Sequence, residues 1–270
     1  MANVYRPPRE VMPKAKAAAQ RALELDETLA DAHVTLAFVL LFYDWDWPAA
    51  EEHLKRATEL SPNSAAAHVL YGSYYTALGR PQEALAEIRF AQALDPLSLA
   101  VQTQLMFGLV TARQFDEAIA YAYKTIEREP NFAFGYAIAA LAYAEKGEFE
   151  RAIETIQKAT KIESNTTFTA FSAHVHAAAG NRSEAEKILQ DLKVISRRRY
   201  VCAYEVAHAY VKLGDKKQAF EWLEKGKQDR ADCMVWLLAE PWMDPLRGDQ
   251  QYRELLDYIG LATGKAGPKP

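Results

Sequence analysis

Residues 65–96, AAAHVLYGSYYTALGRPQEALAEIRFAQALDP, form one complete copy of a unit that recurs along almost the whole chain. Apolar side chains fall at helical spacing on both sides of Gly79, so each half is expected to be an amphipathic helix. Gly72 and Ala84 place small side chains where the two helices come closest, and Pro96 ends the second helix. Such a hairpin cannot cover its own apolar face, so the stretch predicts an array of stacked helix hairpins.

The unit can be followed through the chain by the small residue that opens each expected second helix. These alanines stand 33 or 34 residues apart, and a proline closes the second helix of three units. This pattern resembles the tetratricopeptide repeat family over residues 9–233. The resemblance implies an all-α fold, a right-handed superhelical solenoid of antiparallel helix hairpins that binds protein. The alanines are Ala50, Ala84, Ala118, Ala152, Ala185 and Ala219, and the prolines are Pro62, Pro96 and Pro130.

We expect four parts in the chain. Residues 1–29 hold one unpaired helix, over 9–25, which resembles the second half of a hairpin without its first half. Residues 30–233 form six hairpins, residues 234–262 form helices that cap the last open face, and residues 263–270 form a disordered tail. Because the first helix lacks a partner, we expect the chain to be a piece of a longer polypeptide. A natural N-terminal capping helix is the alternative.

Composition and charge exclude several classes of partner. The chain is 50% hydrophobic and 25% charged with a net charge of −4, so neither nucleic acid nor a membrane surface is the expected partner. No membrane span or signal peptide is evident. Cys202 and Cys233 show no ligand-like spacing, which argues against a disulfide framework and a zinc site and suits a reducing compartment. We therefore expect a cytoplasmic protein.

The sequence contains no pattern typical of an enzyme. A phosphate-binding loop, an HExxH motif and a nucleophile elbow are all absent from it. Acidic residues are spread over the expected outer helix faces beside lysine and arginine, as on solvated helices. We expect no catalytic, cofactor or metal site, because catalysis would need a buried charged residue and the expected groove offers none.

The inner, concave surface of the array is the expected binding site. It should be lined by the residue that follows each core position of a first helix, about 100° further around that helix. None of these residues carries a fixed charge, so we predict an apolar and aromatic groove for an amphipathic helix or an extended apolar peptide. Alternatively, they form a wide core between first helices or are covered by another part of the parent protein. The residues are Val34, Phe38, Leu41, Val69, Ser73, Thr76, Thr103, Phe107, Val110, Ala137, Leu141, Ala144, Ala170, His174, Ala177, Tyr204, His208 and Val211.

Two histidines and two tryptophans invite a second interpretation. His174 and His208 occupy the same position in successive hairpins, so they could bridge a metal or form a pH-sensitive pair, but packed structural histidines are the simpler reading. Trp45 and Trp47 lie in an insertion in the first hairpin's turn. We expect their rings to pack across the open end of that hairpin, with an exposed anchor for a partner as the alternative.

A narrower resemblance concerns the biological context. Five short segments resemble recurring segments in the repeat arms of bacterial multidomain regulators, where the arm follows a winged-helix DNA-binding domain, a serine/threonine kinase or a nucleotide cyclase. The resemblance implies a sensor or docking arm in signalling or transcription regulation. A homo-oligomerisation module, possible as a homodimer, and a solenoid that senses a small molecule are the alternatives. The segments are 43–47, 94–98, 197–201, 220–224 and 244–247.

Overall fold

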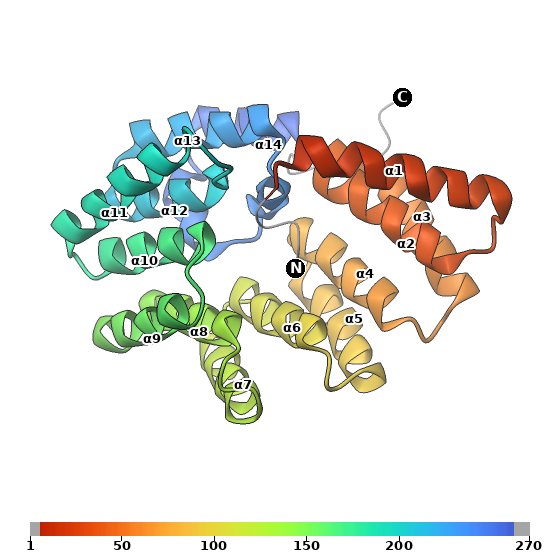
Figure 1. Ribbon diagram of the computed structural model, residues 1–270, viewed down its shortest axis with the longest axis horizontal. Helices are drawn as coiled ribbons and strands as arrows, with labels where there is room; N and C mark the ends of the chain where they lie inside the picture. Colours follow the sequence, from red (N-terminus) through yellow and green to blue (C-terminus); the bar gives the residue numbers. More distant parts are fainter. Residues whose placement is uncertain (1–5, 262–270) are drawn as a thin grey trace.

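The repeating pattern folds into antiparallel helix hairpins that follow one another around an arc (Figure 1). The computed structural model describes residues 6–261, and every regular element within them is a helix. The predicted all-α solenoid of stacked hairpins is confirmed. α1 (Pro8–Leu25) precedes the hairpins and packs against α2. The hairpins are α2 (Ala30–Val39) with α3 (Trp47–Leu60), α4 (Ala65–Ala77) with α5 (Pro81–Leu94), α6 (Leu99–Thr111) with α7 (Phe115–Arg128), α8 (Ala133–Glu145) with α9 (Phe149–Ile162), α10 (Thr166–Ala178) with α11 (Arg182–Ile195), and α12 (Ala203–Leu213) with α13 (Lys216–Asp229).

Small residues allow the two helices of a hairpin to approach closely. In the α4/α5 hairpin, a Cβ atom added at Gly72 would lie 3.1 Å from the backbone oxygen of Ala84 and would overlap the side chain of Ile88. Ala84 and Ala91 are themselves fully shielded from solvent. The sequence prediction that Gly72 and Ala84 mark the helix contact is therefore confirmed.

Several helices begin at a polar side chain that accepts a hydrogen bond from a backbone N–H three residues later. This cap satisfies one of the N–H groups that a helix start leaves without an intrahelical partner. It fixes where α3, α4, α6, α10 and α13 begin. The capping residues are Asp46, Ser64, Ser98, Asn165 and Asp215.

The turn inside most hairpins requires a left-handed backbone. Gly79 has φ +69, and glycine also has positive φ at residues 147, 180 and 214. Arg113, with φ 61, takes the corresponding place in the α6/α7 hairpin. A non-glycine residue in this conformation costs about 1–2 kcal/mol, so this turn is less stable than its neighbours unless the Arg113 side chain compensates.

The insertion in the first hairpin is buried. It forms a π-helix, η2 (Leu40–Asp44), followed by Trp45 with a left-handed backbone. Trp45 and Trp47 are only 8% and 7% exposed. Packing of these rings is confirmed, but their partners include the end of the chain: Trp45 packs edge-on against Tyr258, and Trp47 Nε1 donates a hydrogen bond to Ile259 O (2.6 Å).

The chain end closes the arc. After α13 come two short 3₁₀ helices, η3 (Asp232–Trp236) and η4 (Pro241–Leu246), and then α14 (Gln250–Tyr258). Arg9 of α1 donates to the backbone oxygen of Gln228, so the two ends of the array meet near the top of Figure 1. Within residues 6–261, no helix combines the length and apolarity that crossing a bilayer requires. The tail predicted at 263–270 lies outside the described residues.

Candidate functional site

The concave side of the array holds a segment of the same chain. We call residues 230–249, between α13 and α14, the inner segment; it runs inside the arc of hairpins (Figure 1). Its two 3₁₀ helices contact η2, α4 and α12, which belong to the first, second and last hairpins. Leu238 also lies against the turn glycine Gly79. The inner segment therefore spans the groove from one end of the array to the other.

Two tryptophans anchor the inner segment. Trp236 packs edge-on between Phe42 and Phe107, with ring centroids 5.5 and 4.9 Å away. Trp242, only 1% exposed, packs against His174 and His208 at 5.6 and 5.3 Å. Aromatic pairs at these distances contribute about 0.5–1.5 kcal/mol each beyond the area that they bury.

A carboxylate lies between the two anchors. Glu240 is 3% exposed, and its Oε2 accepts hydrogen bonds from Tyr204 Oη (2.5 Å) and Trp242 Nε1 (2.6 Å). His208 Nε2 stands 3.2 Å from the same oxygen. The expectation that the groove contains no buried charged residue is wrong, because the inner segment brings Glu240 into it.

A partly buried ion pair between Glu145 and Lys212 lies beside His174, which packs on Trp242. Burial lowers the pKa of His174 to about 4, so its ring is neutral at pH 7. Burial alone would raise the pKa of Glu145, but His174, 3.7 Å away, and Lys212, whose Nζ lies 2.5 Å from Oε1, lower it to about 2. The rings of His174 and His208 lie 6.0 Å apart. Among the described residues, no third potential ligand completes a metal site around these two histidines.

The structure divides the predicted groove residues into two groups. Most are buried, either between the helices of the wall or, for His174, Tyr204 and His208, also under the inner segment. A smaller group is partly exposed. The buried group is Leu41, Ser73, Thr76, Val110, Ala137, Leu141, Ala144, Ala170, His174, Ala177, Tyr204, His208 and Val211, and the partly exposed group is Val34, Phe38, Val69, Thr103 and Phe107.

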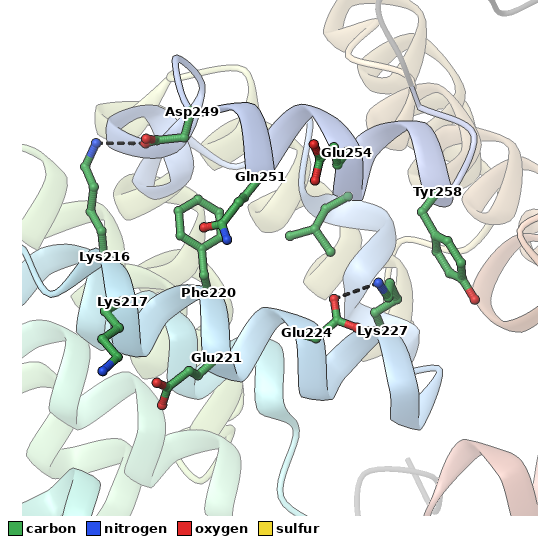
Figure 2. A pocket seen from close by; sticks show the side chains of 11 residues that line it. Lys216, Lys217, Phe220, Glu221, Glu224, Lys227, Asp249, Gln251, Glu254 and Tyr258 are labelled. Atoms are coloured by element: carbon green, nitrogen blue, oxygen red, sulfur yellow. Dashed lines mark hydrogen bonds and ion pairs between the residues drawn. The ribbon is translucent and has the colours of Figure 1, made fainter.

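Two open hollows lie among the described residues. Asp249, the last residue of the inner segment, lines the first of them, and the second contains no residue of that segment. A cleft of about 700 Å³ between α13 and α14 has Phe220 and Tyr258 on its walls among charged side chains (Figure 2). Ion pairs already join charges across or along it, such as Lys216 with Asp249 and Lys227 with Glu224 (Figure 2). The second hollow, of about 320 Å³, is almost wholly apolar and lies between α1 and α2. Its lining is Val11, Met12, Ala15, Val34, Thr35 and Phe38.

The two cysteines lie side by side. Cys202 Sγ and Cys233 Sγ are 2.8 Å apart, and a carboxylate oxygen of Glu205 lies within 4.8 Å of both. The spacing of 31 residues between them does not reveal this proximity, which arises because the inner segment folds back onto the start of α12. The prediction that they form neither a disulfide framework nor a zinc site stays a prediction.

Comparisons with known proteins agree with the fold. The tetratricopeptide repeat profile matches residues 135–166 and 202–228. No curated protein sequence matches the chain. Similar solved structures include PilW, a widely conserved type IV pilus biogenesis factor (20% identity, 73% of this chain, 90% of that chain, TM-score 0.58), pilF of Pseudomonas aeruginosa (18%, 86%, 98%, 0.53), and the APC/C hetero-tetramer Cut9–Hcn1 (16%, 92%, 52%, 0.58). At these identities the likeness shows the fold alone.

Proposed function

We propose that the protein is a non-catalytic protein-interaction scaffold whose concave groove recognises a peptide segment anchored by aromatic side chains. The observation that carries this proposal is the inner segment itself. The groove already holds a short, irregular stretch of polypeptide by two tryptophan anchors and one carboxylate. A partner that uses the groove therefore competes with the inner segment for the same wall.

The chemistry of the inner segment describes the partner. Trp236 fills the gap between two phenylalanines, and Glu240, four residues later, meets Tyr204 and His208. Trp242 follows two residues after the acid. A partner peptide would present a large aromatic, then an acid four residues on, then a second aromatic. Buried aromatic anchors of this kind supply most of the binding free energy in interfaces.

A peptide-binding measurement tests the proposal. In the full chain, Trp236→Ala with Trp242→Ala removes both anchors and leaves the wall residues unchanged. A fluorescent peptide with the sequence of residues 230–249 should bind this double variant, because the vacated wall matches the peptide, and should bind the wild type at least tenfold more weakly, because its own segment competes. Fluorescence anisotropy reports both affinities.

The same peptide with both tryptophans replaced by alanine is the control, and it should bind neither protein. Circular dichroism must show that the double variant keeps its helices. A folded double variant that does not bind the native peptide would refute the groove as a recognition site.

We further propose that this scaffold is the docking or sensor arm of a larger bacterial regulatory protein. The support is the similarity of five short segments to the arms of such regulators. Of these, 244–247 belongs to the inner segment, and the backbone oxygen of Tyr43, in 43–47, accepts a hydrogen bond from Arg230 at the start of that segment. Sequencing the gene upstream of the codon for Met1 tests this context. An effector domain encoded in frame would support the proposal, and a stop codon followed by an unrelated gene would refute it.

Self-association through α1 and α2 is a second candidate function. In the array, α4 packs on both α5 and α6, so each first helix covers a second helix and the next first helix. If α1 is compared with α5 and α2 with α6, the apolar hollow between α1 and α2 lies where α4 lies in the second hairpin. If a second copy fills it, light scattering will show a dimer that Ala15→Glu abolishes. A monomer at every concentration would exclude this candidate.

A further inference from the structure

Two cysteines from different parts of the fold meet where the inner segment begins. Cys202 is the residue at the N-cap of α12, and Cys233 lies in η3. Cys202 is 6% exposed and Cys233 is partly buried. Their Sγ atoms are 2.8 Å apart, a carboxylate oxygen of Glu205 lies within 4.8 Å of both, and Cys233 Sγ contacts Asp232 Oδ1 at 3.4 Å.

We propose that Cys202 and Cys233 form an intramolecular disulfide that fastens the inner segment to α12. A disulfide has a sulfur–sulfur distance of about 2.0 Å, so the two atoms need to approach by about 0.8 Å. Two thiolates bound to one tetrahedral zinc ion would lie about 3.8 Å apart, as Zn–S bonds of about 2.3 Å require. The sulfur atoms are therefore placed closer to the arrangement of a disulfide than to that of a zinc site.

The surroundings of the pair also suit an uncharged bond. Glu205 is 9% exposed and its Oε2 has no hydrogen-bond partner. Burial raises the pKa of Glu205 to about 8, so this carboxyl is mostly neutral at pH 7. Burial also raises the pKa of Asp232. A zinc ion held by the two thiolates and an ionised Glu205 would leave a net charge of −1 in these buried surroundings, whereas a disulfide leaves no charge.

The oxidant in the proposed reaction is a small disulfide such as oxidised glutathione. The Cys233 thiolate, the more accessible of the two, attacks one sulfur of the oxidant, which releases one glutathione thiolate and leaves a mixed disulfide. Cys202 then attacks Cys233 Sγ and releases the second glutathione. The two protein thiols lose their protons to the released thiolates or to water. The protein gains one disulfide, and the oxidant is reduced to two thiols.

The pH dependence of this reaction follows from burial. Burial raises the pKa of Cys202, and the contact with Cys202, together with burial, raises the pKa of Cys233. Because the thiolate is the attacking species, oxidation should become faster as the pH rises above neutral.

The disulfide would restrain the segment that occupies the groove. Cys233 lies three residues before the anchor Trp236, so a bond to α12 keeps that anchor close to the wall even when its ring contacts open. Oxidation would then exclude a partner, and reduction would admit one. The bond itself is independent of the function proposed above, but its effect on partner access rests on that function.

The first experiment tests the bond. The full wild-type chain is incubated in oxidised glutathione at pH 8, and free thiols and intact mass are measured. We expect loss of both thiols and of two hydrogen masses without an added glutathione, whereas Cys202→Ser and Cys233→Ser should each retain a thiol or carry a glutathione. Persistence of both thiols, or a glutathione on each cysteine, would overturn the proposal. So would stoichiometric zinc uptake that protects both thiols, which would assign a metal site instead.

The second experiment tests the restraint. Hydrogen exchange of residues 232–246 should be at least tenfold slower in the oxidised wild type than in Cys202→Ser, because the cross-link limits the open states of the segment. Equal exchange rates would show that the bond forms but does not restrain the segment. Neither result depends on peptide binding, so failure of the proposed groove function and failure of the disulfide are separately visible.

Discussion

One hydroxyl group in the groove offers a direct test of how the inner segment is held. Tyr204 and Glu240 are 1% and 3% exposed, and the tyrosine donates a hydrogen bond to the carboxylate. Tyr204→Phe keeps the ring and leaves the carboxylate with one donor fewer. A hydrogen bond to a charged group contributes about 1.5–3 kcal/mol, so opening of the inner segment should become about 10- to 150-fold more frequent.

Tyr252→Phe is the matched control. Tyr252 is equally buried and its hydroxyl donates to Leu237 O, which is an uncharged acceptor in the same segment. An uncharged pair contributes about 0.5–1.5 kcal/mol, so the expected increase in opening is about 2- to 12-fold.

Hydrogen exchange followed by mass spectrometry is the suitable assay, read on fragments that cover residues 232–246. Repeat arrays open in parts, so a single melting temperature would mix the inner segment with the hairpins. If Tyr204→Phe increased exchange no more than Tyr252→Phe, the carboxylate would not be the anchor that the geometry indicates. If exchange rose equally in α8 and α9, the hydroxyl would be stabilising the whole array instead.

Three further predictions concern single residues. Gly72→Ala should lower the free energy of unfolding by about 1–2 kcal/mol in a urea titration, because the overlap with Ile88 outweighs the better helix propensity of alanine; unchanged stability would contradict the close helix contact. The pKa of His174 is about 4 in the folded protein and 6.5 in the unfolded chain, so the unfolded chain gains this proton first as the pH is lowered. Between pH 6.5 and pH 4 the free energy of unfolding should therefore decrease on acidification by up to about 1.4 kcal/mol per pH unit, and His174→Phe should remove this decrease. Arg113→Gly should relieve about 1–2 kcal/mol of left-handed strain in its turn and slow hydrogen exchange in α6 and α7. Loss of the half-exposed ion pair with Asp244 (2.6 Å) should increase exchange near η4. Faster exchange in α6 and α7 as well would show that the pair outweighs the strain.

Periodic features of the fold are predictable from the sequence. The small residue at the position of Ala84 recurs in all six hairpins, and four of them have glycine at the left-handed turn, because each hairpin needs a close helix contact and a tight turn. The apolar character of the inner wall follows from the same period. Each prediction depends on contacts within about one repeat, where sequence distance and spatial distance remain related.

The occupied state of the groove was not predictable by the same reasoning. Trp236, Glu240 and Trp242 stand in a segment without period, and their partners lie on distant helices such as α6 and α10. One signal in the sequence is that Trp236 and Trp242, two large side chains that are usually buried, both follow the last hairpin. The contact between Cys202 and Cys233 was hidden for the same reason, since it forms only when the segment turns back into the arc.

Closure of the array changes how it must be assembled. The hydrogen bond between Trp47 and Ile259 joins residues 212 positions apart, so the array of hairpins can close only after residue 259 has left the ribosome. Until then the hairpins form in order, each supported by its predecessor, around an empty centre. A ligand present during translation would thus meet an unoccupied wall, while the same ligand added to the folded protein must first displace the inner segment.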